Sequence, residues 1–505
     1  MNKKIKIYGV LLSLALSTVS CLDQDPRDAI LADGAINSVQ TANQAMVGIY
    51  STFKSPALYS GYLTLLPDIQ TDMVHAVQGY SNTYGAIWRW NDILSTNSEI
   101  TSVYGALYTV IGRTNYFFQE VEKLESKIKD EDQLEQLQWY KGEAHFARAL
   151  AYSELVKLFC KAYESDEQAA NELGVVLVSK YPSNGGSLTR ASMYDSYQFI
   201  LNDLAKASEY LALDEDNNEV LYNSTYFTIG AVNALYARMY LYMSDWKNAV
   251  NYASKVIDSD KYLLSSASTN YTSTMTYYQY LWNYDSSTEI IWKVPFEVSS
   301  FGGALGRVFL NYDYSTYRPD YIPSQTALNK FDDADLRYYS FFARARTGYS
   351  HGLVADLLVK YKGNQNFIEQ GILAVNMPKV FRLSEQYLIR AEASAQLKNY
   401  ADAAKDITTL RKARYSSYGT STALGESNWK EIVYDERMKE LYMEGFRLHD
   451  LKRWKLGFTR SKQPQTIETA NTLTVPAGDA RFVWPIPLQE LNSPGNNIQP
   501  NESNK

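Results

Sequence analysis

Two tryptophans that flank an arginine are the residues of this sequence best suited to bind a ligand. They lie in YSNTYGAIWRWND, residues 80 to 92, where Trp88, Arg89 and Trp90 are followed by Asn91. Aromatic rings stack on flat apolar faces, such as the C–H face of a sugar ring, while arginines and amides hydrogen-bond to hydroxyl groups. In an extended segment both tryptophans would share one face and form a platform for successive rings. In a helix they would diverge, and one of them would belong to the core.

A second group of candidate residues lies further along the chain, between residues 277 and 321. It comprises Tyr278, Tyr280 and Trp282 before a predicted strand and Tyr312, Tyr314, Tyr317 and Arg318 after it. These side chains offer the same mixture of apolar faces and hydrogen-bonding groups. The alternating residues at 278, 280 and 282 could instead form the buried face of a strand. Asp68 and Asp72, in LPDIQTDMV, are further candidates for hydrogen bonds to a ligand.

No pattern in the sequence predicts catalysis or a bound cofactor. A glycoside hydrolase would need two carboxylates separated by roughly 5 to 10 Å across a cleft, and no short motif singles out such a pair. The histidines His75, His145, His351 and His449 show neither HExxH spacing nor close pairing for a zinc site. We therefore expect a binding protein without catalytic residues, metal or cofactor, and an enzyme is the rival class.

Composition and charge limit the possible partners. The 505 residues include 42 tyrosines, each of which combines a flat apolar face with a hydroxyl group, although most can simply pack between helices. The formal net charge of −7 argues against nucleic acid as a ligand. With 45% hydrophobic residues the chain can form a large apolar core, and no linker divides residues 41–505 into separate domains.

Residues 1–20 are predicted to be a secretory signal peptide. Three lysines precede an apolar run from Val10 to Ser20, which is too short to span a bilayer. Cys21 follows directly, and a cysteine at this place resembles a bacterial lipobox, in which the cysteine becomes the acylated N-terminus. Residues 21–40 would then form a lipid-anchored tether. The alternative is an ordinary signal peptide beside an incidental cysteine.

Apolar periodicity predicts a largely helical architecture. The clearest amphipathic helix covers residues 138–159. Residues 234–257 and 388–410 repeat a pattern of helix, tight turn, aromatic residue and second helix, which is similar to the tetratricopeptide unit. Residues 288–297 alternate enough to form a strand, and the Gly- and Tyr-rich stretch from 298 to 322 indicates an elaborated loop.

A charged motif, RMKELYMEGFRLHDLKRW, occupies residues 437–454. Its acidic and basic side chains recur three or four residues apart, so on one helix they would form ion pairs. The expected pairs are Arg437 with Glu440, Glu444 with Arg447, and Asp450 with Arg447 or Arg453. We interpret the motif as an ion-pair lattice that ties a terminal helix to the body of the protein.

The same motif resembles the C-terminal motif of the SusD/RagB family. The matching residues are Arg437, Glu440, Leu441, Glu444, Gly445, Arg447, Asp450, Leu451, Arg453 and Trp454. The segments GEAHFARALAYSELVKLF, EIIWKVPF, IPSQTALNKFDDADLR and WPIPLQELN also look like parts of the family pattern. The resemblance implies a mainly α, SusD-like fold with tetratricopeptide-like helical hairpins and an irregular, loop-rich ligand-binding lobe with a few short strands.

The resemblance also implies a function. Members of this family are outer-membrane lipoproteins, anchored through a cysteine in the position of Cys21, that capture oligosaccharide at the cell surface. They deliver it to a SusC-like TonB-dependent transporter, which the helical hairpins face. The family's ligand site is assembled from the two chain regions that hold the candidate aromatic residues. Three alternatives stay open: a peptide-binding protein of the RagB type, a helical glycoside hydrolase, and a scaffold that docks the transporter without binding a ligand.

Overall fold

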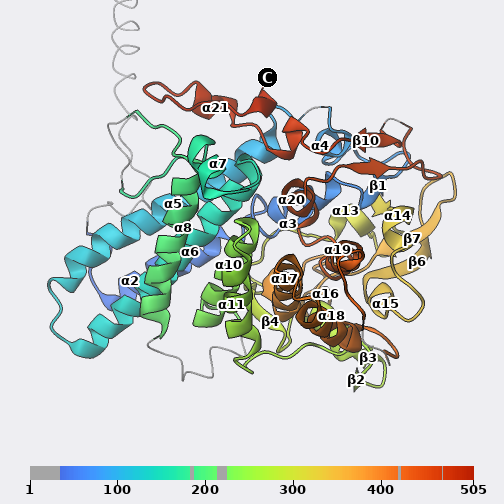
Figure 1. Ribbon diagram of the computed structural model, residues 1–505, viewed down its shortest axis with the longest axis horizontal. Helices are drawn as coiled ribbons and strands as arrows, with labels where there is room; N and C mark the ends of the chain where they lie inside the picture. The colour runs from blue at the N-terminus through green and yellow to red at the C-terminus, as the bar shows by residue number, and fades with distance from the viewer. Residues whose placement is uncertain are drawn as a thin grey trace, which may run out of the picture.

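Long helices form one half of the molecule, and short strands with long connecting segments form the other (Figure 1). The computed structural model describes residues 34–91, 93–181, 187–212, 224–418, 422–468 and 470–504. The predicted signal peptide, Cys21 and most of the predicted tether therefore lie outside the described residues. Within those ranges, no helix is both long and apolar enough to cross a membrane.

Helices α5 and α6 are the longest elements of the helical half, and α6 packs against α2, α5 and α8. The bounds of the larger helices are α2 (Val39–Thr52), α5 (Ser98–Glu125), α6 (Glu131–Phe159), α8 (Met193–Leu211), α10 (Ile229–Tyr242), α11 (Trp246–Ile257), α17 (Leu383–Gln396), α18 (Tyr400–Arg414) and α19 (Trp429–Glu440). Polar N-caps fix several starting points: Asn97 before α5 and Asp130 before α6 each accept a hydrogen bond from a backbone N–H of the first turn.

The two predicted helical hairpins are present. Helices α10 and α11 form the first, α17 and α18 form the second, and α11 packs against α17 so that the hairpins stack side by side although they are distant in sequence. Small buried residues at the same offset in both hairpins, Ala237 with Ala249 and Ala391 with Ala403, allow this close approach. The predicted helix at 138–159 is the C-terminal part of α6.

The other half is built from short elements. Among the described residues, its strands pair as five separate two-stranded antiparallel ladders, β1 with β5, β2 with β3, β4 with β8, β6 with β7, and β9 with β10. Their bounds are β1 (Val74–Ala76), β2 (Asn270–Thr272), β3 (Met275–Thr276), β4 (Ile290–Lys293), β5 (Tyr321–Pro323), β6 (Phe342–Arg346), β7 (Val354–Leu358), β8 (Lys379–Arg382), β9 (Phe458–Arg460) and β10 (Leu473–Val475). The predicted strand at 288–297 is β4.

The remaining helices are short. Most of them lie between the strands of this half, whereas α7 lies between α6 and α8 and packs on α8. They are α3 (Tyr62–Ile69), α4 (Gly85–Arg89), α7 (Asp166–Asn171), α12 (Tyr277–Tyr284), α13 (Arg307–Leu310), α14 (Gln325–Leu328), α15 (Arg337–Phe341), α16 (Gln365–Ile368), α20 (Arg447–Arg453) and α21 (Leu488–Leu491), with 3₁₀ turns at Ala480–Phe482 and Glu502–Asn504. The predicted loop from 298 to 322 is mostly irregular and contains only α13 and the start of β5.

Each half has its own large apolar core. The first lies among α2, α5, α6, α8 and α10, and it includes Leu107, Leu150 and Leu235. The second lies under β1, β5, β6 and β7, and it includes Trp88 and Trp282. The second core is the base from which the surface loops of the irregular half project.

Candidate ligand-binding site

The two chain regions predicted to form the ligand site lie side by side. The backbone N–H of Ser81 donates to the carboxylate of Asp320 at 2.7 Å, and the Ser81 hydroxyl donates to both Asp320 oxygens at 2.9 Å. The Tyr321 hydroxyl donates to the carbonyl of Thr83 at 2.6 Å. Because Asp320 and Tyr321 are themselves buried, these bonds fix the segment around residue 80 against the loop that follows α13.

This loop presents three tyrosines at the surface. The rings of Tyr312 and Tyr317 stack with their centroids 4.6 Å apart, and the Tyr314 ring lies 6.0 Å from that of Tyr312. Tyr314 is 66% exposed and Tyr312 39%, which is unusual for side chains of this size. Asp313 accepts hydrogen bonds from the backbone N–H groups of Ser315 and Thr316, so a tight local turn holds the rings in place.

The turn between β6 and β7 joins the loop to the segment around residue 80. The backbone N–H of Gly348 donates to the carbonyl of Tyr317 at 2.9 Å, and the Tyr349 hydroxyl donates to the carbonyl of Pro319 at 2.9 Å. A ring nitrogen of His351 lies 3.0 Å from the carbonyl of Gln78. Three chain regions that are distant in sequence therefore meet at one surface.

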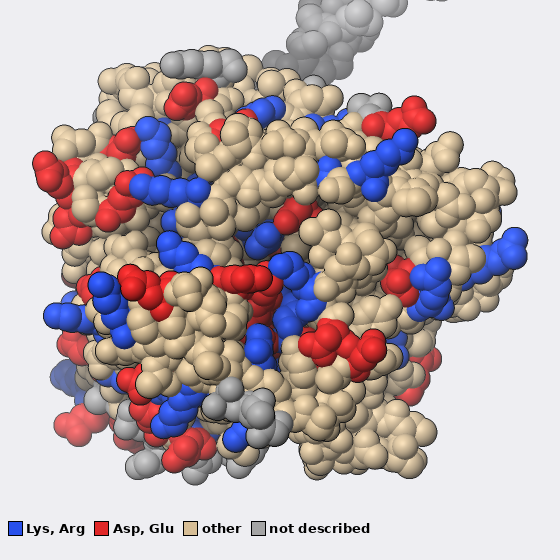
Figure 2. Space-filling model, turned by 45° about the vertical axis from the view of Figure 1, so that its right-hand side comes forward, with Lys and Arg blue, Asp and Glu red and all other residues tan. Residues whose placement is uncertain are grey.

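Arg89 lies at the edge of this surface, half-buried at the end of α4. It donates to the hydroxyl of Tyr80 at 2.6 Å and to the side-chain oxygen of Asn82 at 2.7 Å. We name this region the aromatic loop surface and define it by Tyr80, Arg89, Tyr312, Tyr314, Tyr317, Arg318 and Tyr349. Figure 2 brings this side of the molecule forward, and the right-hand part of the view is mostly uncharged.

Trp88 and Trp90 are placed differently from the expected extended platform. Trp88 lies in α4, and both indoles are at most 1% exposed. The Trp88 Nε1 donates to the carbonyl of Val74 at 3.1 Å, and that of Trp90 donates to the carbonyl of Gln70. The segment is helical, so the two rings diverge into different clusters of the core and offer no face to a ligand in this structure. Asn91 is exposed directly after them.

The two aspartates of LPDIQTDMV also have internal partners. Asp68 is buried and accepts the backbone N–H groups of Gly445 and Arg447 at 3.0 and 2.7 Å. Burial raises the pKa of Asp68 to about 7. Asp72 accepts two hydrogen bonds from the Arg447 guanidinium, at 3.0 and 2.9 Å. Both carboxylates hold the start of α20 and lie apart from the aromatic loop surface.

Tyr278, Tyr280 and Trp282 belong to a helix, α12, and not to a strand. Tyr278 and Trp282 are four residues apart, so they share the buried face of this helix and are at most 2% exposed. Tyr280 points to the opposite, half-exposed face, where its ring lies 4.1 Å from that of Tyr271. Tyr280 therefore lies on a different face of α12 from Tyr278 and Trp282, although the sequence predicted one group of three residues.

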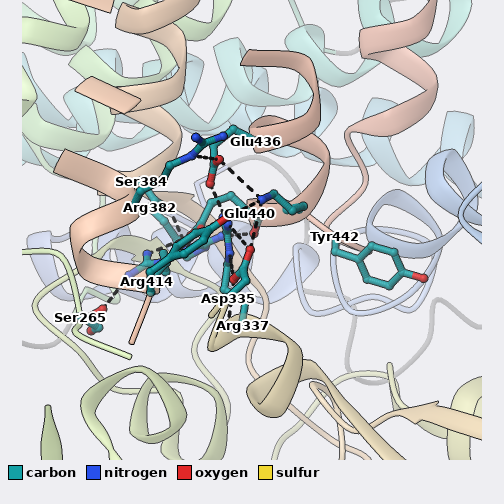
Figure 3. Close-up of polar contacts among 12 residues, drawn as sticks. Ser265, Asp335, Arg337, Arg382, Ser384, Arg414, Glu436, Glu440 and Tyr442 are labelled. Carbon is teal, nitrogen blue, oxygen red and sulfur yellow. Dashed lines mark hydrogen bonds and ion pairs between the residues drawn. The ribbon is translucent and has the colours of Figure 1, made fainter. Parts of the chain in front are cut away.

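The charged motif at 437–454 folds as two helices, α19 and α20, rather than one. Glu440, the last residue of α19, is fully buried and contacts Arg337, Arg382 and Arg414 at 2.9 to 3.1 Å (Figure 3). Burial alone would raise the pKa of Glu440, but the charges of Arg414 and Arg382 hold it well below the ordinary value. These three arginines come from other segments of the chain.

Other pairs of the motif are also rearranged. Arg437 pairs with Asp450 at 2.7 Å, and Asp450 also pairs with Arg453 at 2.9 Å. The sequence predicted the pair of Asp450 with Arg453 but not the pair of Arg437 with Asp450. Glu444 pairs with Lys360 and Arg382, each at 2.7 Å. The lattice does tie the C-terminal helices to the body, but it is buried and its partners are distant in sequence. The aromatic loop surface is therefore the stronger candidate for ligand contact.

Sequence reasoning missed Tyr80 and Tyr349 as members of the surface. Tyr80 lies in segment 80–92, but the spacing of the two tryptophans is the stronger signal there, so the prediction did not include Tyr80. Tyr349 reaches the surface through the pairing of β6 with β7, with Phe342 opposite Leu358, and sequence periodicity carries no signal for such contacts. Two tyrosines near Tyr280, Tyr271 and Tyr277, were missed as well, although both are nearly half exposed.

Comparison with known proteins matches two family models to different parts of the chain. The model described as the SusD family matches residues 357–502, and the model described as "Starch-binding associating with outer membrane" matches residues 21–241. Both models describe SusD-like proteins, and together they match most of the chain. The match to residues 357–502 includes the charged motif at 437–454, whose buried pairs join the irregular half of this SusD-like fold to its helical hairpins.

Individual relatives match the chain over different lengths. SusD-like protein P25 of Formosa agariphila is 24% identical over 97% of this chain and 96% of its own. Starch-binding protein SusD of Bacteroides thetaiotaomicron is 27% identical over 32% of this chain and 28% of its own. A crystal structure of a SusD superfamily protein from Bacteroides thetaiotaomicron has a TM-score of 0.77, with 23% identity, 92% coverage of this chain and 99% coverage of its own.

Proposed function

We propose that this protein is a cell-surface lipoprotein that binds oligosaccharide on the aromatic loop surface and passes it to a SusC-like TonB-dependent transporter. The observation that carries the proposal is the cluster of Tyr312, Tyr314 and Tyr317 on one surface, with Tyr314 66% exposed. Two similarities support the choice of ligand. A matching family model is described as starch-binding, and one relative is a starch-binding protein.

The arrangement suits a neutral, hydroxylated ligand. The exposed ring of Tyr314 and the stacked pair of Tyr312 and Tyr317 can each cover the C–H face of a sugar ring. The exposed guanidinium of Arg318, which lies beside the Gly348 backbone, can donate hydrogen bonds to hydroxyl groups at the edge of the rings. Apolar faces with a polar edge are the combination that recognises sugars.

The carboxylates of the surface already have structural partners, which favours binding without cleavage. Asp313 accepts the backbone N–H groups of its own turn, and Asp320 accepts the backbone N–H and the hydroxyl of Ser81. A glycoside hydrolase needs two carboxylates that face the substrate, one of which donates a proton. In this proposal both carboxylates instead fix the loop on which the tyrosines lie.

Anchoring and delivery are further parts of the proposal. Cys21 would carry the lipid, and the residues between it and Val39 would lead to α2. The description "associating with outer membrane" of the model that matches residues 21–241 supports this location. The stacked hairpins α10–α11 and α17–α18 would face the transporter.

The first prediction concerns Tyr314→Ala. Isothermal titration calorimetry of the purified protein against plant, microbial and host polysaccharides and short peptides should identify one glycan that binds without new reducing ends. The substitution should weaken that binding about tenfold, equivalent to roughly 1.4 kcal/mol. Tyr339→Ala is the matched control, because Tyr339 is 58% exposed but lies on α15, outside the surface.

Three results would contradict the proposal. Release of new reducing ends would make the protein a glycosidase. A response to peptides alone would place it with peptide-uptake proteins. An equal loss of affinity in Tyr314→Ala and Tyr339→Ala would remove the aromatic loop surface as the binding site.

A further inference from the structure

A second pocket with aromatic walls lies far from the aromatic loop surface. Its volume is about 670 Å³, within the range of roughly 300 to 1,000 Å³ that is usual for small-molecule sites. It is bounded by residues 260–266 after α11, by the β2–β3 hairpin, by α12 and by residues 286–288. In Figure 1 the hairpin is at the bottom of the view, whereas α13 and the β6–β7 ladder are at the right.

Tyrosines form one wall of this pocket. The rings of Tyr271 and Tyr280 lie 4.1 Å apart, and the Tyr277 ring meets that of Tyr271 edge to face at 5.5 Å. Tyr280 also stacks on Tyr284 at 4.9 Å, which extends the aromatic wall along α12. Tyr271 and Tyr277 are 46% and 45% exposed, and Leu263 beside them is 62% exposed. Large apolar faces remain open to solvent at one place.

Hydroxyl groups line the rest of the pocket. They belong to Ser265, Ser266, Thr269, Ser286, Ser287 and Thr288. Asp260 and Lys261 are the charged residues of the lining, one of each sign, so the pocket carries no net charge. A pocket with aromatic faces, many hydroxyls and balanced charge favours a neutral polyhydroxylated ligand over a phosphate or a carboxylate.

The floor of the pocket is held rigidly by the buried charge network. The Arg414 guanidinium donates to the carbonyl of Ser265 at 2.6 Å (Figure 3). The Ser265 N–H donates to the carboxylate of Glu289 at 2.8 Å. Arg414 also pairs with Glu289 at 2.8 Å and with Glu440 at 2.9 Å. A preorganised floor lowers the entropy lost when a ligand binds.

The opposite edge of the floor is fixed as well. The backbone N–H of Leu263 donates to the carbonyl of Thr288 at 3.2 Å, and the hydroxyls of Ser265 and Ser287 are 2.5 Å apart. These bonds join residues 263–265 to the segment that leads into β4. The backbone N–H of Tyr278 in α12 donates to the carbonyl of Ser266 at 3.0 Å, so the aromatic wall and the hydroxyl floor are parts of one fixed cavity.

We infer that this pocket is a second saccharide-binding site, sized for a mono- to trisaccharide. The inference rests on the proposed function for its ligand class, but it concerns a different place on the molecule. Sugar rings would lie against Tyr271 and Tyr277, with their hydroxyl groups toward the serines and threonines of the floor. Two separated sites on one molecule would raise its avidity for long glycan chains.

The test uses trisaccharides and two double variants of the purified protein. The probes are maltotriose, cellotriose, xylotriose, mannotriose and laminaritriose, measured by calorimetry and by saturation-transfer NMR. One variant is Tyr271→Ala with Tyr277→Ala, and the other is Tyr312→Ala with Tyr314→Ala. All four side chains are at least 39% exposed, so neither variant opens the core, and circular dichroism checks the fold.

We expect at least one trisaccharide to bind at two molecules per protein. Each double variant should retain one of the two sites. In the variant that carries Tyr271→Ala and Tyr277→Ala, the affinity of the pocket should fall by at least tenfold. If only one trisaccharide molecule binds per protein, and if this binding is lost in the variant with Tyr312→Ala and Tyr314→Ala, the second site is overturned and the proposed function stands. Loss only in the 271/277 variant would support the pocket and remove the loop site. Absence of binding by every probe in both measurements would overturn both.

Discussion

The tryptophans at 88 and 90 show how one residue type can serve either a surface or a core. Their spacing beside Arg89 fits a platform for sugar rings, yet both indole N–H groups are satisfied by backbone carbonyls inside the protein. The guanidinium of Arg460 lies 4.2 Å from the Trp88 ring, so a buried cation packs on this face. The exposed aromatic residues of the aromatic loop surface are Tyr312 and Tyr314.

The prediction for Trp88→Ala follows from its burial. The substitution should lower the free energy of unfolding by about 3 to 5 kcal/mol, because it removes a large buried ring and leaves a cavity. Urea unfolding monitored by circular dichroism measures the loss. Tyr314→Ala is the matched comparison and should change stability by no more than about 0.5 kcal/mol.

The two outcomes separate a core residue from a ligand contact. A stable Trp88→Ala protein that fails to bind glycan would mean that Trp88 contacts ligand in a conformation other than this one. An unstable variant that still binds below its unfolding transition would agree with the structure.

At the scale of elements, local sequence patterns were sufficient to predict several helices and one strand. They were not sufficient to predict which distant segments pair. The helical hairpins at 234–257 and 388–410, the helix at 138–159 and strand β4 follow from periodicity and spacing. Helix α12 was mistaken for a possible strand because aromatic residues alternate within it. A capping box was the available signal, since Thr276 and Gln279 bond to each other's backbone N–H groups.

The candidate site was predictable to the level of chain regions only. The regions around residues 80 and 312 do meet, but the side chains that face solvent depend on the bonds of Asp320 and on the β6–β7 turn. The partners of Glu440 were unpredictable for the same reason, because Arg337, Arg382 and Arg414 lie in three separate segments. Periodicity within one helix cannot report such contacts.

Gly445 decides how the C-terminal motif folds, and Gly445→Ala tests this. Its φ of +85° lies in the left-handed region, and an added Cβ would lie 2.3 Å from the carbonyl oxygen of Leu63. The substitution should therefore reduce the free energy of unfolding by at least about 2 kcal/mol. Chemical denaturation provides the measurement.

Gly105→Ala is the control for this prediction. Gly105 lies inside α5, and an added Cβ there would meet no atom within 4 Å. Alanine should stabilise the helix by about 0.5 to 1 kcal/mol. If both substitutions changed stability equally, the left-handed turn at 445 would not be a structural requirement.

At the scale of the whole molecule, buried carboxylates make stability depend on pH. Glu143 of α6 accepts the hydroxyl of Tyr50 of α2 at 2.6 Å, and burial raises its pKa to about 8. A raised pKa means that the folded state binds more protons than the unfolded state between about pH 4.5 and pH 8. The contribution of Glu143 to the free energy of unfolding should therefore fall as the pH rises through this window.

Glu143→Gln should remove this slope. The amide oxygen can still accept the Tyr50 hydroxyl, but it carries no charge. As the pH rises, the free energy of unfolding of the variant should therefore increase relative to that of the natural protein by up to about 1.4 kcal/mol per pH unit. Urea unfolding at pH 5, 6.5 and 8 measures the difference. Parallel pH profiles for the two proteins would show that Glu143 does not titrate in this range. Asp68, with a pKa of about 7, contributes in the same direction to both proteins.

The two halves of the molecule have different roles in the proposed function. The stacked hairpins form a continuous helical body, while the irregular half carries both the aromatic loop surface and the wall of the second pocket. Buried ion pairs of Arg337, Arg382 and Arg414 join the halves, so the loops project from a fixed base. A capture protein needs such a base because rigid loops bind with a smaller entropic cost.

The most direct test of the central claim is a crystal structure of the protein with the oligosaccharide that calorimetry identifies. We predict an intact glycan whose sugar rings stack on Tyr314 and on the pair of Tyr312 and Tyr317, with Arg318 bonded to its hydroxyl groups. A glycan bound elsewhere with these tyrosines free, or a glycan found cleaved, would contradict the account.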